Sequence, residues 1–309
     1  MSKRKQNTKI LKKDIINRLR IFLIAALTVI IFYPPYLQGL FFEKHVLPTQ
    51  IIVFIIFIVF LVYKWLKGDY AFLKTPIEYI GLGFVIVYFI SIFAAVHTRS
   101  AIIEWLKYCM YFVVFYMITD LADNQRSKLL FLWTMVISAV GVAIIGLDAT
   151  LGGKIVGILN TFFKALGVKG DLFFGLFVDN RIHSTMQYPN ALASYLLAVF
   201  LVNVGLLCVQ SKLWQKFLLG SSAFILFTTF MLTQSRGAQL LFPVVIILIL
   251  IVAPKDFKIK AATHVLLLAI PAGVVSLIIS PYLSSDYLNK NVILLFLSGL
   301  FLTIFISLV

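Results

Sequence analysis

The sequence predicts an all-α membrane protein, a polytopic bundle of transmembrane helices. Of its 309 residues, 61% are hydrophobic and 13% are charged, which is about half the charged share of an ordinary soluble domain. Apolar runs of roughly 20 residues recur along almost the whole chain, and each is long enough to cross about 30 Å of hydrocarbon as a helix. These observations exclude a water-soluble globular protein.

Ten candidate spans lie between clusters of polar residues, proline and glycine. They cover residues 21–42, 50–66, 76–96, 101–119, 129–147, 190–210, 214–233, 237–253, 261–281 and 292–309. The first run is too long for the apolar core of a secretory signal and lacks a small-residue cleavage site, so we interpret it as a retained span.

The charge distribution predicts the orientation of the chain. The net charge is +15, and many basic residues crowd a tail at 1–20, before the first span. With this tail in the cytoplasm, 18 of the 27 lysines and arginines fall on the cytoplasmic side and 8 outside, as the positive-inside rule expects. We therefore predict about ten spans, with a cytoplasmic tail at 1–20 and a transmembrane domain at 21–309. Membrane lipids, rather than nucleic acid, are the expected partners of the basic residues.

One long extracytoplasmic loop is predicted at 148–189, a segment of 42 residues without a spanning run. Within it, apolar residues recur at helical spacing, while lysines and a threonine occupy the other positions. The apolar residues are Ile155, Ile158, Leu159, Phe162, Phe163 and Leu166. This pattern is typical of a helix that lies in the membrane interface.

Two arginines precede helices that are expected to run inward from the outer face. Arg181 lies upstream of Asn190, the expected cap of one helix, and Arg236 follows Ser235, the expected cap of a helix that begins at Gly237. Free N–H groups at a helix start, the macrodipole and a guanidinium together favour an anion. Two such sites on one membrane face suit a diphosphate. The alternative is that each arginine only anchors its helix at the interface.

Three further ionisable residues are candidates. His183 is a possible general base, because an imidazole titrates near neutral pH. Glu104 and Lys107 lie three residues apart near the outer end of the fourth span, where they are possible supporting residues or an ion pair that only neutralises itself. Neither histidines nor carboxylates show metal-ligand spacing, so we expect no metal and no cofactor.

The arginine motifs resemble those of a known family. The stretch from Arg181 to Tyr195 contains Arg, Ser-Thr and Tyr-Pro-Asn, and Gln-Ser-Arg-Gly follows at 234–237. This pattern resembles the O-antigen ligase and O-antigen polymerase family, in particular its members from Gram-positive bacteria. The resemblance implies a metal-independent glycosyltransferase of the bacterial cytoplasmic membrane. Such an enzyme takes a glycan from undecaprenyl diphosphate on the extracytoplasmic face and transfers it to a hydroxyl of a glycan, lipid or protein acceptor.

The resemblance also implies roles for individual residues. Arg181 and Arg236 would hold the diphosphate, and Asn190 and Ser235 would orient the helix ends. Residues of the same motifs that would support them are Ser184, Tyr188, Gln234 and Gly237.

The sequence departs from the family in three respects. Family members carry a long late outer loop with a histidine proposed to activate the acceptor, whereas the late outer loop here covers only 284–291 and contains no histidine. Ser184 replaces a glycine that is common in the family motif. The chain also stops at Val309 within an apolar run. We therefore expect an incomplete domain that lacks the catalytic base, with His183 as the remaining candidate.

Two other functions remain open from the sequence. A non-enzymatic carrier, flippase or binding subunit for a lipid-diphosphate-linked glycan is the first. A carrier requires charged groups along a path through the bilayer, and the spans contain almost none beyond Glu104 and Lys107. A structural or regulatory membrane subunit, whose arginines only anchor it, is the second.

Overall fold

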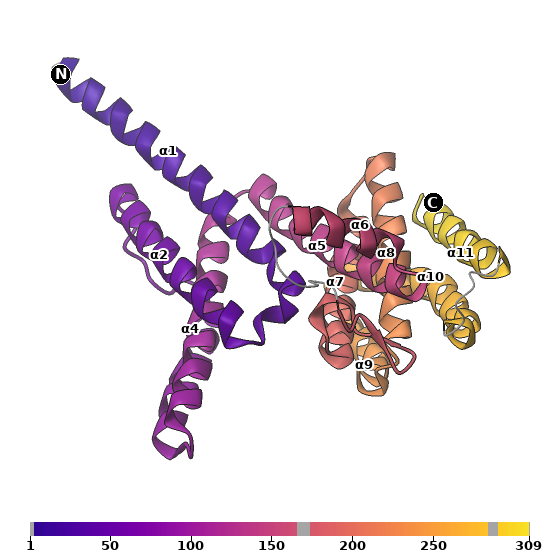
Figure 1. The fold of residues 1–309 in the computed structure, drawn as a ribbon. Helices are drawn as coiled ribbons and strands as arrows, with labels where there is room; N and C mark the ends of the chain where they lie inside the picture. The colour runs from indigo at the N-terminus through magenta and orange to yellow at the C-terminus, as the bar shows by residue number, and fades with distance from the viewer. Residues whose placement is uncertain (1–2, 166–173, 284–289, 309) are drawn as a thin grey trace. The chain divides into compact units, whose positions relative to one another are not determined.

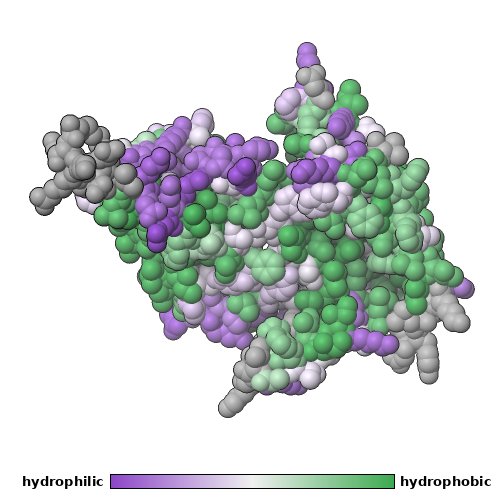
Figure 2. Space-filling view, turned by 90° about the horizontal axis from the view of Figure 1, so that it is seen from above, coloured by the Kyte–Doolittle hydropathy of each residue, from purple (hydrophilic) through white to green (hydrophobic). Residues whose placement is uncertain are grey.

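The computed structural model of the chain describes residues 3–165, 174–283 and 290–308 (Figure 1). Within these ranges, nine helices are long and apolar enough to cross a membrane, and a shorter apolar helix of 17 residues corresponds to the eighth predicted span. Hydrophobic residues cover much of the surface in Figure 2, as lipid contact requires. The chain is an all-α, multi-pass membrane protein, as predicted.

The helices and strands follow one another with short connections. In order they are α1 (Lys3–Phe32), α2 (Glu43–Lys67), α3 (Pro76–Ser91), α4 (Thr98–Leu121), α5 (Gln125–Thr150), α6 (Lys154–Ala165), β1 (Phe177–Val178), β2 (Arg181–Ile182), α7 (Pro189–Val209), α8 (Leu213–Leu232), α9 (Arg236–Val252), α10 (Lys255–Ile279) and α11 (Lys290–Leu308). The helix expected within segment 148–189 is present as α6. Leu166, which was predicted to continue its pattern, lies outside the described residues.

The chain divides into two compact units. The first comprises residues 1–34 and 40–131, in which α2 packs against α1 and α4, and α3 packs against α4. The predicted end of the first span at residue 42 is wrong, because α1 ends at Phe32 and α2 already begins at Glu43. Pro34 and Pro35 follow the end of α1, and neither has the backbone N–H that a continuing helix would need. The chain makes two short 3₁₀ turns there instead.

A buried ionic cluster joins α2, α4 and the connection between α2 and α3 in the first unit. Asp120 accepts hydrogen bonds from the ammonium groups of Lys64 at 3.4 Å and Lys74 at 2.8 Å. Lys74 also donates to Asp69 at 2.8 Å. This hydrogen bond lowers the pKa of Asp69 from its ordinary value, although burial opposes the shift. The side chains of Lys64 and Asp120 are 7% and 4% exposed, so their charges depend on this pairing.

The second unit comprises residues 35–39 and 132–309. Its central helix is α8, which packs against α7, α10 and α11. Close packing of α11 depends on Gly299, because a Cβ there would lie 2.5 Å from Cγ2 of Val275 and 2.8 Å from the ring of Phe224. Small residues let membrane helices approach closely in this way. The candidate site lies at one end of this unit.

Candidate functional site

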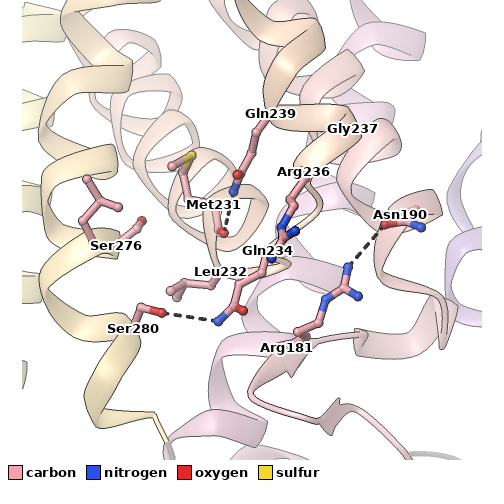
Figure 3. Close-up of a pocket in the computed structure, with 11 residues that line it drawn as sticks. Arg181, Asn190, Met231, Leu232, Gln234, Arg236, Gly237, Gln239, Ser276 and Ser280 are labelled. Carbon is pink, nitrogen blue, oxygen red and sulfur yellow. Dashed lines mark hydrogen bonds between the residues drawn. The ribbon is translucent and has the colours of Figure 1, made fainter.

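A pocket of about 640 Å³ lies where four helix ends of the second unit meet (Figure 3). Helices α7 and α9 begin at the pocket, and α8 and α10 end there. The described residues that line it are Arg181, Asn190, Met231, Leu232, Gln234, Arg236, Gly237, Gln239, Ser276, Leu277 and Ser280. Arg181 and Arg236, which lie in two separate sequence motifs, therefore line one pocket.

A two-stranded hairpin presents Arg181. Val178 of β1 pairs with Arg181 of β2 in an antiparallel register, and Asp179 and Asn180 form the two-residue turn. Both turn residues have positive φ, 51° and 57°. Tight hairpin turns require this conformation, and Asp and Asn tolerate it better than most residues. The sequence analysis did not predict this hairpin, although the Asp-Asn pair is a signal for it.

The guanidinium of Arg181 links the hairpin to two helix ends. Its Nε–H donates to the carbonyl oxygen of Thr233, just after α8, at 2.9 Å. Its Nη2 donates to Oδ1 of Asn190 in the first turn of α7, at 3.3 Å. These bonds fix a half-buried guanidinium with part of its donor set facing the pocket (Figure 3). A lysine would not reproduce this planar fork.

The predicted capping role of Asn190 is wrong, whereas the predicted cap position of Ser235 is confirmed. Tyr188 is the N-cap of α7, so Asn190 lies inside the first turn. Ser235 does occupy the N-cap position of α9, but α9 begins at Arg236 rather than Gly237, and the Ser235 side chain makes no capping bond. Its hydroxyl donates instead to Oδ1 of Asn190 at 2.9 Å. The Asn190 amide thus connects the Arg181 motif to the Arg236 motif, because its oxygen accepts from both.

Arg236 is the first residue of α9, and its side chain is exposed at the pocket. In Figure 3, the side chains of Arg236 and Arg181 point toward one another across the pocket. Among the described residues, neither guanidinium forms an ion pair with a carboxylate. The first N–H groups of α7 and α9 have no partner within their own helices. The negative ends of α8 and α10 offset the positive ends of α7 and α9. The excess positive charge of the pocket therefore comes from the two guanidinium groups, and with the free N–H groups it suits an anion.

Gln234 ties the pocket to α10. This residue has φ of 52°, and its side-chain amide donates to the carbonyl oxygen of Asn180 at 2.8 Å and to the hydroxyl of Ser280 at 3.3 Å. Ser276 and Ser280 lie one turn apart, so both reach the pocket from the end of α10. The sequence analysis missed these serines and also Gln239. Polar residues at a spacing of four within an apolar span are the signal that marks the serines.

Ser184 anchors the chain after the hairpin and lies away from the pocket. Its side chain is fully buried, and its hydroxyl donates to the carbonyl oxygen of Val142 in α5 at 2.6 Å. Its φ is 48°, which lies in the left-handed region that glycine adopts without strain. The conformation at this position thus favours glycine, the residue that Ser184 replaces relative to the resembled family motif. The Ser184 hydroxyl bond helps to stabilise the strained backbone.

Replacing Ser184 by glycine is expected to leave stability nearly unchanged, whereas Ser184→Ala is expected to destabilise. Both variants lose the hydroxyl bond, worth about 1 kcal/mol, but only glycine relieves the left-handed strain, which is of similar size. Thermal unfolding of the purified protein in detergent measures the difference. The alanine variant should be less stable than the glycine variant by about 1 kcal/mol, and equal stability would contradict the strain.

His183 and Tyr188 flank the pocket in sequence, but neither is among its described lining residues. The Tyr188 hydroxyl accepts a hydrogen bond from Nδ2 of Asn190 at 3.2 Å. His183 is half-buried, and its backbone N–H donates to Leu176. Burial lowers the pKa of His183 below its ordinary value, and Arg181 lowers it further, against a hydrogen bond with the Gln187 backbone and the charge of Asp179. Burial therefore favours the neutral imidazole over the charged form.

The stability of the protein is expected to decrease as the pH falls below about 6.5, in part through His183. Because its folded-state pKa is lowered from the ordinary value of 6.5, the unfolded chain takes up a proton more readily. The contribution of His183 to stability is present above the pKa that it has in the unfolded chain. It is lost as the pH falls toward the lower pKa of the folded protein. Unfolding curves recorded between about pH 7.5 and 5, a window around the ordinary pKa of histidine, measure this dependence of stability on pH. His183→Gln should flatten the dependence, and an unchanged pH profile in that variant would assign it to other groups.

Glu104 and Lys107 belong to the first unit. Oε2 of Glu104 and Nζ of Lys107 lie 2.8 Å apart, so the predicted pairing across one helical turn is confirmed. Within the described ranges, no three His, Cys, Asp or Glu side chains gather as ligands of a metal ion would.

No protein-family model, curated protein or solved structure matches this chain. The pocket and the residues around it are therefore the basis on which a function is assigned.

Proposed function

We propose that the chain binds a lipid-linked diphosphate in the Arg181–Arg236 pocket, as the donor-binding part of an extracytoplasmic glycosyltransferase. The donor is a glycan carried on undecaprenyl diphosphate, and the acceptor is a hydroxyl of a glycan, lipid or protein. This proposal places the chain among the O-antigen ligases and polymerases, whose motifs it resembles. The observation that carries it is the convergence of two guanidinium groups, neither of which forms an ion pair within the described ranges, with the starts of α7 and α9 at one pocket.

The electrostatics of the pocket support a diphosphate over a neutral ligand. Two guanidinium groups supply planar donors that match phosphate oxygens, and helix N-termini add partial positive charge. A site of about 640 Å³ is within the usual range for small-molecule pockets. Polar side chains of Gln234, Gln239 and Ser280 supply further hydrogen-bonding groups around the same space.

In the proposed reaction, the acceptor oxygen forms a bond to the anomeric carbon as the bond from that carbon to the diphosphate oxygen breaks. The electron pair of the broken bond passes to the diphosphate, whose charge increases. Arg181 and Arg236 stabilise this developing charge, because they are already in position before the reaction. The proton of the acceptor hydroxyl passes to a base. His183 is the candidate on this chain, and its burial favours the neutral imidazole that a base requires.

The proposal includes an orientation. The N-terminus is cytoplasmic, segment 148–189 is extracytoplasmic, and α7 and α9 begin at the outer face of a bacterial cytoplasmic membrane. The excess of lysine and arginine on the tail side supports this arrangement. The pocket then faces the side where glycans on lipid carriers are transferred.

The test is binding of undecaprenyl diphosphate to the full chain in nanodiscs. We expect tighter binding of the diphosphate than of undecaprenyl monophosphate, and binding that weakens as salt is added. Replacing Arg181 and Arg236 together by glutamine should weaken binding about 100-fold or more, because each charge-assisted hydrogen bond contributes about 1.5–3 kcal/mol.

The matched control is Arg99→Gln. Arg99 is an exposed arginine of the first unit that pairs with Glu43 at 3.2 Å, so its loss should leave diphosphate binding unchanged. Equal binding by the double variant and the unaltered chain would refute the proposal and assign both arginines to membrane anchoring.

A non-enzymatic binding or carrier role is the second candidate. The observation that favours it is that none of the described lining residues is Asp, Glu, His or Lys, so the described lining holds the anion without offering a base. Proteoliposomes distinguish the two roles. Appearance of the lipid-linked glycan on the opposite leaflet without a new glycosidic bond indicates a carrier, and a new bond indicates the transferase.

A further inference from the structure

Helix α6 has two apolar sides, and only one of them is packed against other residues that the structure describes. Val156 and Leu159 face a small core cluster that also contains Ile145, Leu176 and Tyr36. On the other side, Ile155, Ile158 and Phe162 are 45%, 70% and 57% exposed. An exposed row at i, i+3 and i+7 is continuous along one helix. It indicates a contact with something apolar outside the described part of the chain.

The attachment of α6 to α5 locates it at the end of a membrane span. Helix α5 ends at Thr150, and Gly152 and Gly153, with φ of 94° and 65°, turn the chain into α6. Oδ2 of Asp148, in the last turns of α5, accepts the N–H of Val156 at 2.8 Å and fixes the start of α6. A helix held at the end of a transmembrane helix lies at the boundary between lipid and water.

The polar residues of α6 match a lipid surface. Lys154 and Thr161 lie beside the exposed apolar row, four residues before and three residues after Ile158, and Lys164 lies on another side of the helix. Lysines beside such a row place their ammonium groups among anionic headgroups. An open hollow of about 750 Å³ runs along α6, and its described lining combines Lys154 with Ile158 and Phe162. The same surface thus offers a cation for a phosphate and apolar contacts for an acyl chain.

The packed side of α6 leads directly to the Arg181 hairpin. Leu176 belongs to the core cluster under α6 and immediately precedes β1. Its carbonyl oxygen accepts the backbone N–H groups of His183 at 2.8 Å and Ser184 at 2.9 Å, and so closes the hairpin behind Arg181. A displacement of α6 would therefore disturb the residue that holds both ends of the hairpin.

We infer that α6 docks its Ile155–Ile158–Phe162 row into an anionic lipid surface and, through Leu176, holds the Arg181 hairpin in place. The occupant of the row is the bilayer interface itself. This inference concerns the position of the hairpin and does not depend on the ligand of the pocket.

The first experiment measures the depth of α6 in the membrane. With Cys109 and Cys208 replaced by serine, a single cysteine at Ile158 or at Lys164 carries a nitroxide in vesicles that contain phosphatidylglycerol. Power saturation is expected to show that the label at 158 collides with oxygen more than with a water-soluble nickel complex, and that the label at 164, which lies on another side of the helix, does the reverse. Equal nickel access at both positions would overturn lipid docking, as would spin coupling between copies or shielding of 158 from both reagents.

The second experiment measures the link to the hairpin by amide hydrogen exchange in the same vesicles. Ile158→Glu should raise exchange of the peptide that contains His183 and Ser184 several-fold, because local opening controls exchange. The control Lys164→Glu places a glutamate on an exposed side of α6 away from the row and should leave exchange unchanged. Vesicles of phosphatidylcholine alone should give faster exchange than those with phosphatidylglycerol. No effect of Ile158→Glu would refute the link, and no lipid dependence would refute the preference for anionic headgroups.

Discussion

Replacing Arg181 by glutamine is expected to abolish most diphosphate binding and also to lower the thermal stability of the second unit. The guanidinium faces the pocket, but it also donates to the Thr233 carbonyl at the end of α8 and to Asn190. Loss of one charge-assisted hydrogen bond to the diphosphate weakens its binding by about 1.5–3 kcal/mol. The Thr233 carbonyl also loses its charged hydrogen-bond donor, which lowers the stability of the folded protein by about 1–3 kcal/mol.

Arg236→Gln separates binding from stability. Among the described residues, Arg236 makes no hydrogen bond through its guanidinium that would be lost with the side chain, and it is exposed. We therefore expect weaker binding with an unchanged unfolding temperature. Undecaprenyl diphosphate titration and thermal unfolding of the same preparations measure both quantities. If Arg236→Gln unfolds at a lower temperature while binding normally, the residue is structural and the proposed site is wrong.

Replacing Asp120 by alanine is expected to destabilise the first unit by about 3–5 kcal/mol, the usual cost of leaving one partner of a buried ion pair. Its carboxylate accepts from Lys64 at 3.4 Å and Lys74 at 2.8 Å, and Lys64 is itself buried in the last turn of α2. The remaining carboxylate, Asp69, lies 3.8 Å from Lys64 and compensates the charge only in part. Denaturant-induced unfolding in mixed micelles measures the loss.

Asp14→Ala is the matched control for this prediction. Asp14 pairs with Arg18 in α1 at 2.9 Å, but the two side chains are 53% and 79% exposed. Exposed pairs contribute about 0–1 kcal/mol. A double variant, Lys64→Met with Asp120→Leu, should regain most of the stability that Asp120→Ala loses, because apolar side chains can replace a buried pair. Equal losses for Asp14→Ala and Asp120→Ala would show that the cluster does not stabilise the unit.

Local signals in the sequence were sufficient to predict which segments form helices, but not where each helix begins and ends. Long apolar runs predicted the spans, because a helix must satisfy its own backbone in lipid. The end of α1 was misplaced because Pro34 and Pro35 stop the helix within an apolar run that continues to Phe42. The cap of α7 was misassigned for a different reason. Asn190 is a good capping residue, but its side-chain oxygen accepts hydrogen bonds from Arg181 and Ser235 instead.

The candidate site was only partly accessible from the sequence. Arg181 and Arg236 could be predicted, because each lies within a few residues of a side chain that is typical of a helix start. Ser276 and Ser280 were not predicted, because they reach the pocket from a span whose register against α8 is set by packing. The hairpin of Phe177–Ile182 was missed for lack of length, as two strands of two residues show no alternating pattern.

The sequence by itself determined that this is an all-α, multi-pass membrane protein with an amphipathic helix after the fifth span, because hydrophobic length and period are properties of consecutive residues. Only the tertiary structure decided that Arg181 and Arg236 line one pocket, that Asn190 joins their motifs, and that Leu176 connects α6 to the hairpin. These contacts join residues tens of positions apart. Their geometry depends on how α7, α8, α9 and α10 pack in three dimensions, which a one-dimensional pattern of apolar residues does not specify.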